Sequence, residues 1–127
     1  MPMSYRIDLK RGAVFLTATG RLTNDDLITC VAGLNADPDL MPGMPTLTDA
    51  TGVTEMEVDL KGFRALTEVM DNSQTPRGES RAALLVTKHG DAMLGKLLMA
   101  ISKAESSLPR YRVFDDRAAA ESWLGIS

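Results

Sequence analysis

Apolar and polar side chains alternate in the first residues of the chain, between Tyr5 and Leu9. A period of two residues is typical of a strand with one buried face. The turn signal at 10–12 is followed by an apolar run that predicts a second strand over 13–19, with Gly20 as its breaker. The chain is therefore expected to open with an antiparallel hairpin.

After Thr23 the spacing of the apolar residues becomes that of a helix. Val31 and Leu34, with the apolar residues before them, recur at the three- and four-residue spacing of one helix face. Thr23 is the expected cap, because its hydroxyl can accept the backbone N–H of Asp26. The helix should end before Pro38, since proline cannot continue it.

Strand-like and helix-like segments alternate in the rest of the chain. They are a strand at 46–51 ended by Gly52, a helix that begins at Asp59, a strand at 82–86, a helix from Gly90, a strand at 111–114 and a last helix capped by Asp115 or Asp116. This order predicts a mostly parallel sheet with right-handed crossovers. The expected fold class is α/β, with about five strands, an N-terminal antiparallel hairpin and four helices.

The size and the charge of the chain limit the classes of function. Its 127 residues suit a single domain over 1–127. The net charge is −3 and the basic residues are scattered, so we expect no nucleic-acid partner. The chain has no signal-peptide pattern at its amino terminus and no window near the ~20 apolar residues of a membrane span. We expect a cytoplasmic protein that is not integral to a membrane.

Candidate metal ligands and redox groups are few. Cys30 is the one cysteine, and its helical surroundings favour a small buried side chain over a reactive thiol. One cysteine and one histidine exclude most structural zinc patterns. Asp91, Asp115 and Asp116 stand where helix caps are expected, which explains them without an ion. The sequence predicts no metal and no cofactor.

Three short motifs carry a family resemblance. They are Tyr-Arg-Ile-Asp at 5–8, Leu-Thr-Asn-Asp-Asp-Leu at 22–27 and Leu-Thr-Asp-Ala-Thr-Gly-Val-Thr at 47–54. Together with the order of elements, they resemble the STAS/SpoIIAA-like family, and more narrowly its small stand-alone bacterial proteins. The resemblance covers almost the whole chain and implies the same fold.

The same resemblance implies a regulatory role with a phosphoryl switch. Members that act as anti-anti-sigma factors carry a phosphorylatable serine at the start of the helix after the third strand. The matching stretch here, 56–60, has no serine or threonine, and Asp59 or Glu57 stands in the region instead. A carboxylate there is stabilised by the helix dipole as a phosphate would be, but it cannot be switched. Thr51 and Thr54 remain as displaced candidates.

Ligands of parallel α/β sheets bind beyond the carboxyl ends of the strands, so we look for the site there. The candidate ligand- or partner-binding residues are Asp49, Thr51, Thr54, Met56, Asp59, Phe63, Lys88 and His89. His89 with a nearby aspartate could form an acid/base pair, but no serine or cysteine stands in an activating motif. We therefore expect no enzymatic activity.

Two functions without catalysis remain open. The favoured one is a regulatory module that binds a protein partner through the second helix and its flanking loops, where Met41, Met44 and Met56 lie. The alternative is a carrier or sensor of a small apolar, lipid-like ligand, in a groove lined by these methionines and Phe63. A homodimer is kept as an alternative, because C₂ dimers are the commonest soluble assembly.

Overall fold

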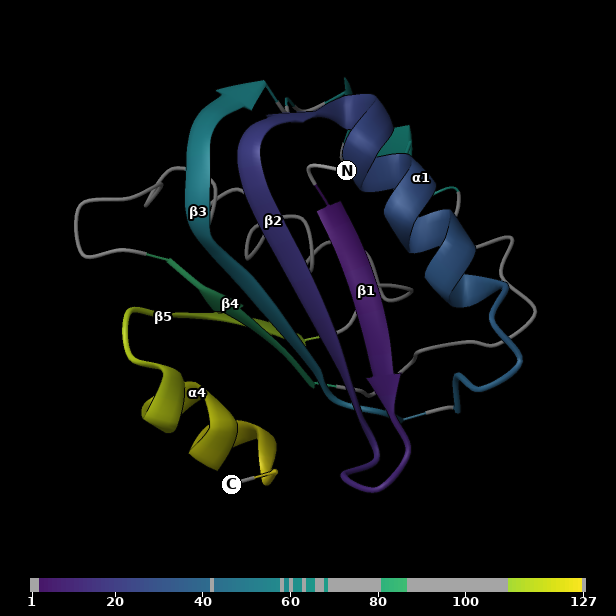
Figure 1. The fold of residues 1–127 in the computed structure, drawn as a ribbon, viewed down its shortest axis with the longest axis vertical. Coiled ribbons are helices and arrows are strands. Elements are labelled where there is room, and N and C mark those ends of the chain that lie inside the picture. The colour runs from purple at the N-terminus through teal and green to yellow at the C-terminus, as the bar shows by residue number, and fades with distance from the viewer. Residues whose placement is uncertain are drawn as a thin grey trace.

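The predicted hairpin opens a five-stranded sheet with the order β1-β2-β3-β4-β5 (Figure 1). The structure is a computed structural model, and it describes residues 3–41, 43–57, 59, 61, 62, 64, 65, 68, 81–86 and 110–126. The elements are β1 (Met3–Asp8), β2 (Ala13–Thr23), α1 (Asn24–Asn35), β3 (Thr46–Glu57), β4 (Arg81–Leu85), β5 (Arg110–Phe114) and α4 (Arg117–Leu124). β1 is antiparallel to β2, and the other neighbouring pairs are parallel. The predicted α/β class, the hairpin and the mostly parallel sheet are confirmed.

The second and third of the four predicted helices lie largely or wholly outside the described residues. Residues 61, 62, 64, 65 and 68 have helical backbone, and α1 and α4 are the helices defined in the described part of the chain. No helix among these residues is long and apolar enough to cross a membrane.

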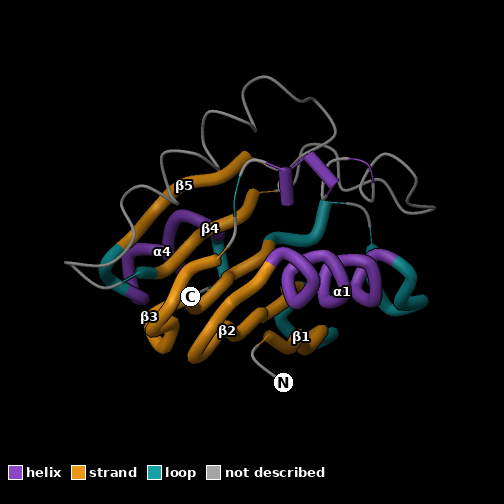
Figure 2. The backbone as a smooth tube through the Cα atoms, turned by 90° about the horizontal axis from the view of Figure 1, so that it is seen from above, coloured by secondary structure: helices purple, strands orange, loops and turns teal. Residues whose placement is uncertain are grey.

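The central strand β2 buries side chains on both faces of the sheet. Val14 and Leu16 join one hydrophobic cluster with Leu34 of α1, whereas Phe15 joins another with Leu124 of α4. Successive side chains of a strand point to opposite faces, so one apolar run serves both clusters. The two helices accordingly lie on opposite sides of the sheet (Figure 2). The apolar run at 82–86 is buried as well, as a strand covered on both faces requires.

Helix α1 begins with the cap that its sequence predicts. The Thr23 hydroxyl accepts the backbone N–H of Asp26 at 3.3 Å, and the Asp26 carboxylate accepts the backbone N–H of Thr23 at 3.1 Å. This reciprocal pair is a capping box. The helix ends at its C-cap Ala36, before Pro38, as expected. Tyr5 then ties the end of the helix to β1, because its hydroxyl donates to Asp37 at 2.8 Å.

The last strand and helix also follow their sequence signals. β5 pairs in parallel with β4, which brings the carboxyl-terminal part of the chain into the sheet. Asp116, rather than Asp115, caps α4, and its carboxylate accepts the backbone N–H of Ala118 at 3.3 Å. Ala120 and Leu124 are buried against the sheet, whereas Ala119 is exposed. A helix advances about 100° per residue, which turns Ala119 away when Ala120 points inward.

Two strands are longer than the sequence predicts. β2 continues past Gly20 to Thr23, and β3 continues past Gly52 to Glu57. Both glycines lie where the pairing register between these strands shifts, so they mark bulges rather than strand ends. Gly20 has a φ of 65°, a left-handed conformation that glycine adopts without steric cost.

Gly52 is required by the close approach of β2 to β3 at the bulge. A Cβ atom at this position would lie 2.9 Å from Cγ2 of Thr19, a β-branched side chain that is stiff about χ1. We expect Gly52→Ala to lower the free energy of unfolding by about 1–3 kcal/mol, the usual cost of overpacking. Urea denaturation measures it.

The matched background is Thr19→Ser, which removes the methyl group and keeps the hydroxyl. In that background Gly52→Ala should be neutral or stabilising, because alanine loses less backbone entropy than glycine on folding. An equal loss of stability in both backgrounds would show that the contact with Thr19 does not explain the glycine.

Candidate functional site

The structure places the candidate residues in two groups and leaves some of them undescribed. Asp49 and Thr51 lie in β3, within the strand predicted at 46–51, and Thr54 lies in it as well because β3 continues past the predicted end at Gly52. The strand continues because its whole length pairs with β2. Asp59 follows the strand. Phe63, Lys88 and His89 lie outside the described residues, as does the side chain of Met56, whose backbone pairs with Leu22.

Asp49 lies level with the carboxyl ends of the neighbouring strands. The register of β3 with β4 ends where Asp49 is opposite Leu85, and Leu85 in turn is opposite Phe114 at the end of β5. Arg117 opens α4 and places a guanidinium nitrogen 3.7 Å from the Asp49 carboxylate. The same carboxylate accepts the backbone N–H of Thr51 at 2.9 Å and the Thr51 hydroxyl at 2.6 Å.

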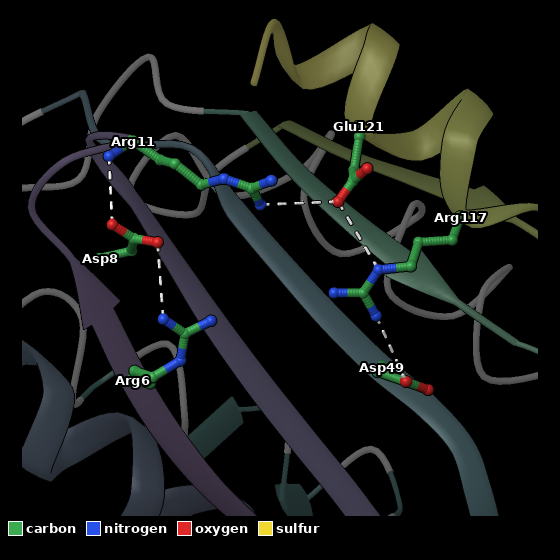
Figure 3. A network of polar contacts seen from close by, with 6 residues as sticks. All are labelled: Arg6, Asp8, Arg11, Asp49, Arg117 and Glu121. Atoms are coloured by element: carbon green, nitrogen blue, oxygen red, sulfur yellow. Dashed lines mark hydrogen bonds and ion pairs between the residues drawn. The ribbon is translucent and has the colours of Figure 1, made fainter. Parts of the chain in front are cut away.

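A chain of charges continues from Asp49 across this face of the sheet (Figure 3). Arg117 contacts Glu121 at 3.6 Å, and Glu121 contacts Arg11 of the β1–β2 turn at 3.7 Å. Each exposed ion pair of this kind contributes only ~0–1 kcal/mol. The arrangement nevertheless links the hairpin, β3 and α4, so Asp49 is part of a structural contact between elements.

Phe15 lies beneath the same network. The guanidinium of Arg6 lies 4.9 Å from the centre of the Phe15 ring, and that of Arg11 lies 5.6 Å from it. Asp8 contacts Arg6 at 3.5 Å and accepts the backbone N–H of Arg11 at 3.1 Å. The two cations therefore lie over an aromatic ring that is itself buried and that packs in one cluster with Leu124 of α4.

Asp59 is the centre of the second group. Its carboxylate accepts the backbone N–H of Gly62 at 3.0 Å, which is the cap geometry that the sequence predicts. It also accepts the side-chain amide of Asn24 at 3.0 Å, and the backbone N–H of Asp59 donates to the amide oxygen of Asn24 at 3.2 Å. The hydrogen bond from Gly62, followed by that from Asn24, lowers the pKa of Asp59 below its ordinary value. The carboxylate is therefore charged at neutral pH.

Gly62 allows Asn24 to reach this position. A Cβ atom at Gly62 would collide with the side-chain amide of Asn24. The first residue of α1, Asn24, can therefore pack against the turn after β3 only because the residue that it meets there, Gly62, has no side chain. Asn24 and Asp59 are 35 residues apart in the chain, so this contact has no local sequence signal.

Exposed charges surround Asp59 at the carboxyl ends of β2 and β3. Arg21 donates to Glu57 at 2.6 Å and lies 4.0 Å from Glu55, and the hydrogen bond to Glu57 raises the pKa of Arg21. We call Asp25, Glu55, Glu57 and Asp59, all of them exposed, the acidic rim. Among the described residues, no three His, Cys, Asp or Glu side chains are grouped so that they could hold a metal ion.

A pocket that the sequence reasoning missed lies between the start of β1 and the first half of α1. It has a volume of about 360 Å³ and is lined by Met3, Ser4, Tyr5, Asp25, Asp26, Thr29 and Cys30. Cys30 is buried, as expected, and burial raises the pKa of its thiol. The spacing of residues 25, 26, 29 and 30 places them on one helix face, but no local sequence pattern indicates that a pocket lies beside that face.

The loop methionines do not form the predicted apolar surface together. Met41 is 59% exposed, whereas Met44 is buried in the cluster beneath α1. Met44 was expected on the contact surface, and that expectation is wrong because the loop folds back over the edge of the core. Its backbone N–H donates to the carbonyl of Met41 at 3.2 Å, which closes this turn.

The lowered pKa of Asp59 makes a pH-dependent prediction. A carboxylate whose pKa is lower in the folded state stabilises that state above its unfolded pKa of about 3.9, and the stabilisation is lost as the pH falls through the folded pKa. We expect Asp59→Asn to be less stable than the original chain at pH 7 and pH 5, and the difference to shrink below about pH 4. Urea denaturation across this range measures the difference.

The control is Asp115→Asn, which removes one exposed carboxylate elsewhere. If both variants show the same pH profile, the effect reflects net charge and not the cap formed by Asp59.

Comparisons with known proteins bear on the fold. No protein-family model and no curated protein matches the chain. A solved structure of similar fold is that of an uncharacterised protein of the DUF3478 family with a SpoIIAA-like fold from Shewanella loihica PV-4. The likeness has a TM-score of 0.58 at 16% sequence identity and covers 96% of this chain and 93% of that one. At this identity the likeness shows the fold alone, and this chain has a SpoIIAA-like fold.

Proposed function

We propose that the domain is a non-enzymatic regulatory module of the cytoplasm that binds a protein partner through the acidic rim, without a phosphoryl switch. The observation that carries the proposal is the state of Asp59. Its carboxylate caps the helix that follows β3, where the family resemblance implies a phosphorylatable serine, and it is held by Gly62 and Asn24. The negative charge at this position is permanent, so the proposed binding does not depend on a kinase.

The charge of the rim suggests the chemistry of the partner. Glu55 and Glu57 share Arg21, and Asp25 and Asp59 flank Asn24, which leaves an excess of negative charge on exposed side chains. Such a surface favours a partner segment that carries Lys or Arg, because complementary charge speeds association and excludes partners of like charge. Binding through the rim should therefore weaken as the salt concentration rises.

Site-specific photo-crosslinking in cells tests the proposal. A crosslinking amino acid replaces exposed Thr54, next to the rim, and in a second variant exposed Leu9, in the β1–β2 turn at the opposite end of β2. We expect Thr54 to form an adduct with one protein that Leu9 does not form. The adduct should disappear with Glu55→Lys and Glu57→Lys combined, and purified partner and domain should bind with an affinity that falls with salt.

Equal adducts at the two positions would contradict the proposal, because the rim would then have no special role. An adduct at Thr54 that survives both charge reversals would show that partner binding does not depend on the negative charge of the acidic rim. Far-ultraviolet circular dichroism of each variant shows whether the fold is retained.

A further inference from the structure

The pocket lies between β1 and the first half of α1, and Tyr5 of β1 forms its hydrogen bonds near the other end of the helix. The Tyr5 hydroxyl donates to Asp37 at 2.8 Å and lies 3.4 Å from the carbonyl oxygen of Gly33, so the second half of α1 is held against β1. Beside the first half of the helix, the hollow of about 360 Å³ remains. This volume is at the small end of the range for small-molecule sites, ~300–1,000 Å³.

The residues that line the pocket include both apolar side chains and carboxylates. Met3 and Cys30 are buried and Tyr5 is partly buried, whereas Asp25 and Thr29 are exposed at the mouth. Small-molecule sites commonly have this composition, with apolar surface for the body of a ligand and a few polar groups that orient it.

The titratable groups of the pocket are negative or neutral at pH 7. The hydrogen bond to Asp37 raises the pKa of Tyr5, and burial raises the pKa of Cys30, so both side chains keep their protons. Asp25 and Asp26 supply the negative charge, and no lysine or arginine is among the lining residues. A helix N-terminus attracts anions with a charge of only about +0.5, which the two carboxylates outweigh.

We infer that this pocket binds a small organic cation, a protonated amine that carries one apolar group about the size of a single ring. The apolar group contacts Met3, Tyr5 and Cys30, and the ammonium group lies at the mouth beside Asp25. Asp26 contributes charge, although its Oδ2 already accepts the backbone N–H and the hydroxyl of Thr23. The inference is independent of the proposed protein partner, although Asp25 belongs to both surfaces.

Titration with matched probes tests the inference on the full chain. Phenethylamine is the cationic probe, 2-phenylethanol has the same ring without the charge, and phenylacetate reverses the charge. We expect saturable binding of phenethylamine in the millimolar range or below, which suits so small a ligand. The amide signals that move in ¹H–¹⁵N spectra should be those of 3–5 and 25–30. The two other probes should bind several-fold more weakly.

Asp25→Asn should weaken phenethylamine binding about fivefold, the effect of losing one charge at about 4 Å in water. The matched control Asp115→Asn has the same net charge, stands just before α4 and does not line the pocket, so it should leave the affinity unchanged.

Each of the opposite results overturns the inference. Equal affinity for phenethylamine and 2-phenylethanol would show an apolar site without charge selection. Equal effects of Asp25→Asn and Asp115→Asn would show non-specific attraction to an acidic protein. No saturation by any probe, or saturation that leaves the amide signals of 3–5 and 25–30 unmoved, would show that the hollow does not bind such ligands. The failure of partner crosslinking at Thr54 would not affect any of these readouts.

Discussion

The parallel pairing of β2 with β3 is the interaction on which the rest of the structure depends. It runs from Val14 opposite Thr46 to Thr23 opposite Glu57, through two register shifts. The shifts let two strands with glycine inside them remain paired, because a bulge absorbs the extra residue without ending the ladder. This pairing sets the start of α1 beside the turn after β3. Without it, Asn24 and Asp59 would not meet.

The candidate surface at that end of the sheet is therefore a product of capping chemistry and strand pairing together. Thr23 and Asp59 each cap a helix, and the Asn24 side chain bridges the two helix starts. The cap occupied by Asp59 is the one where the family resemblance implies a switchable hydroxyl. A carboxylate that already accepts a backbone and an amide donor stabilises the turn, and its charge is a fixed property of the surface. Regulation through this domain, in our proposal, resides in what binds to it.

The opposite face of the sheet shows a different use of charged residues. Arg6 and Arg11 cover Phe15, and Arg117 joins Asp49 to α4. These contacts lie over Phe15 and tie α4 to β3 on this face. Asp49, which the sequence suggested for function, thus links β3 to α4, and Thr51 hydrogen-bonds to the Asp49 carboxylate. The two surfaces that remain for recognition in the described part of the chain are the acidic rim and the pocket beside β1, and they meet at Asp25.

Local patterns in the sequence determined the identity of the elements and their starts. The two-residue period predicted the hairpin, and the apolar run at 82–86 predicted a strand covered on both faces. Helix caps could also be predicted, at Thr23, Asp59 and Asp116, because a short capping side chain needs only a backbone N–H two or three residues away. Tertiary structure alone decided where β2 and β3 end. In the sequence a glycine predicts the end of a strand, but here the pairing of the two strands continues beyond Gly20 and Gly52. Tertiary structure also decided the bond from Asn24 to Asp59, the ion pair of Asp49 and the pocket, because each depends on the distance between segments that the chain order does not specify.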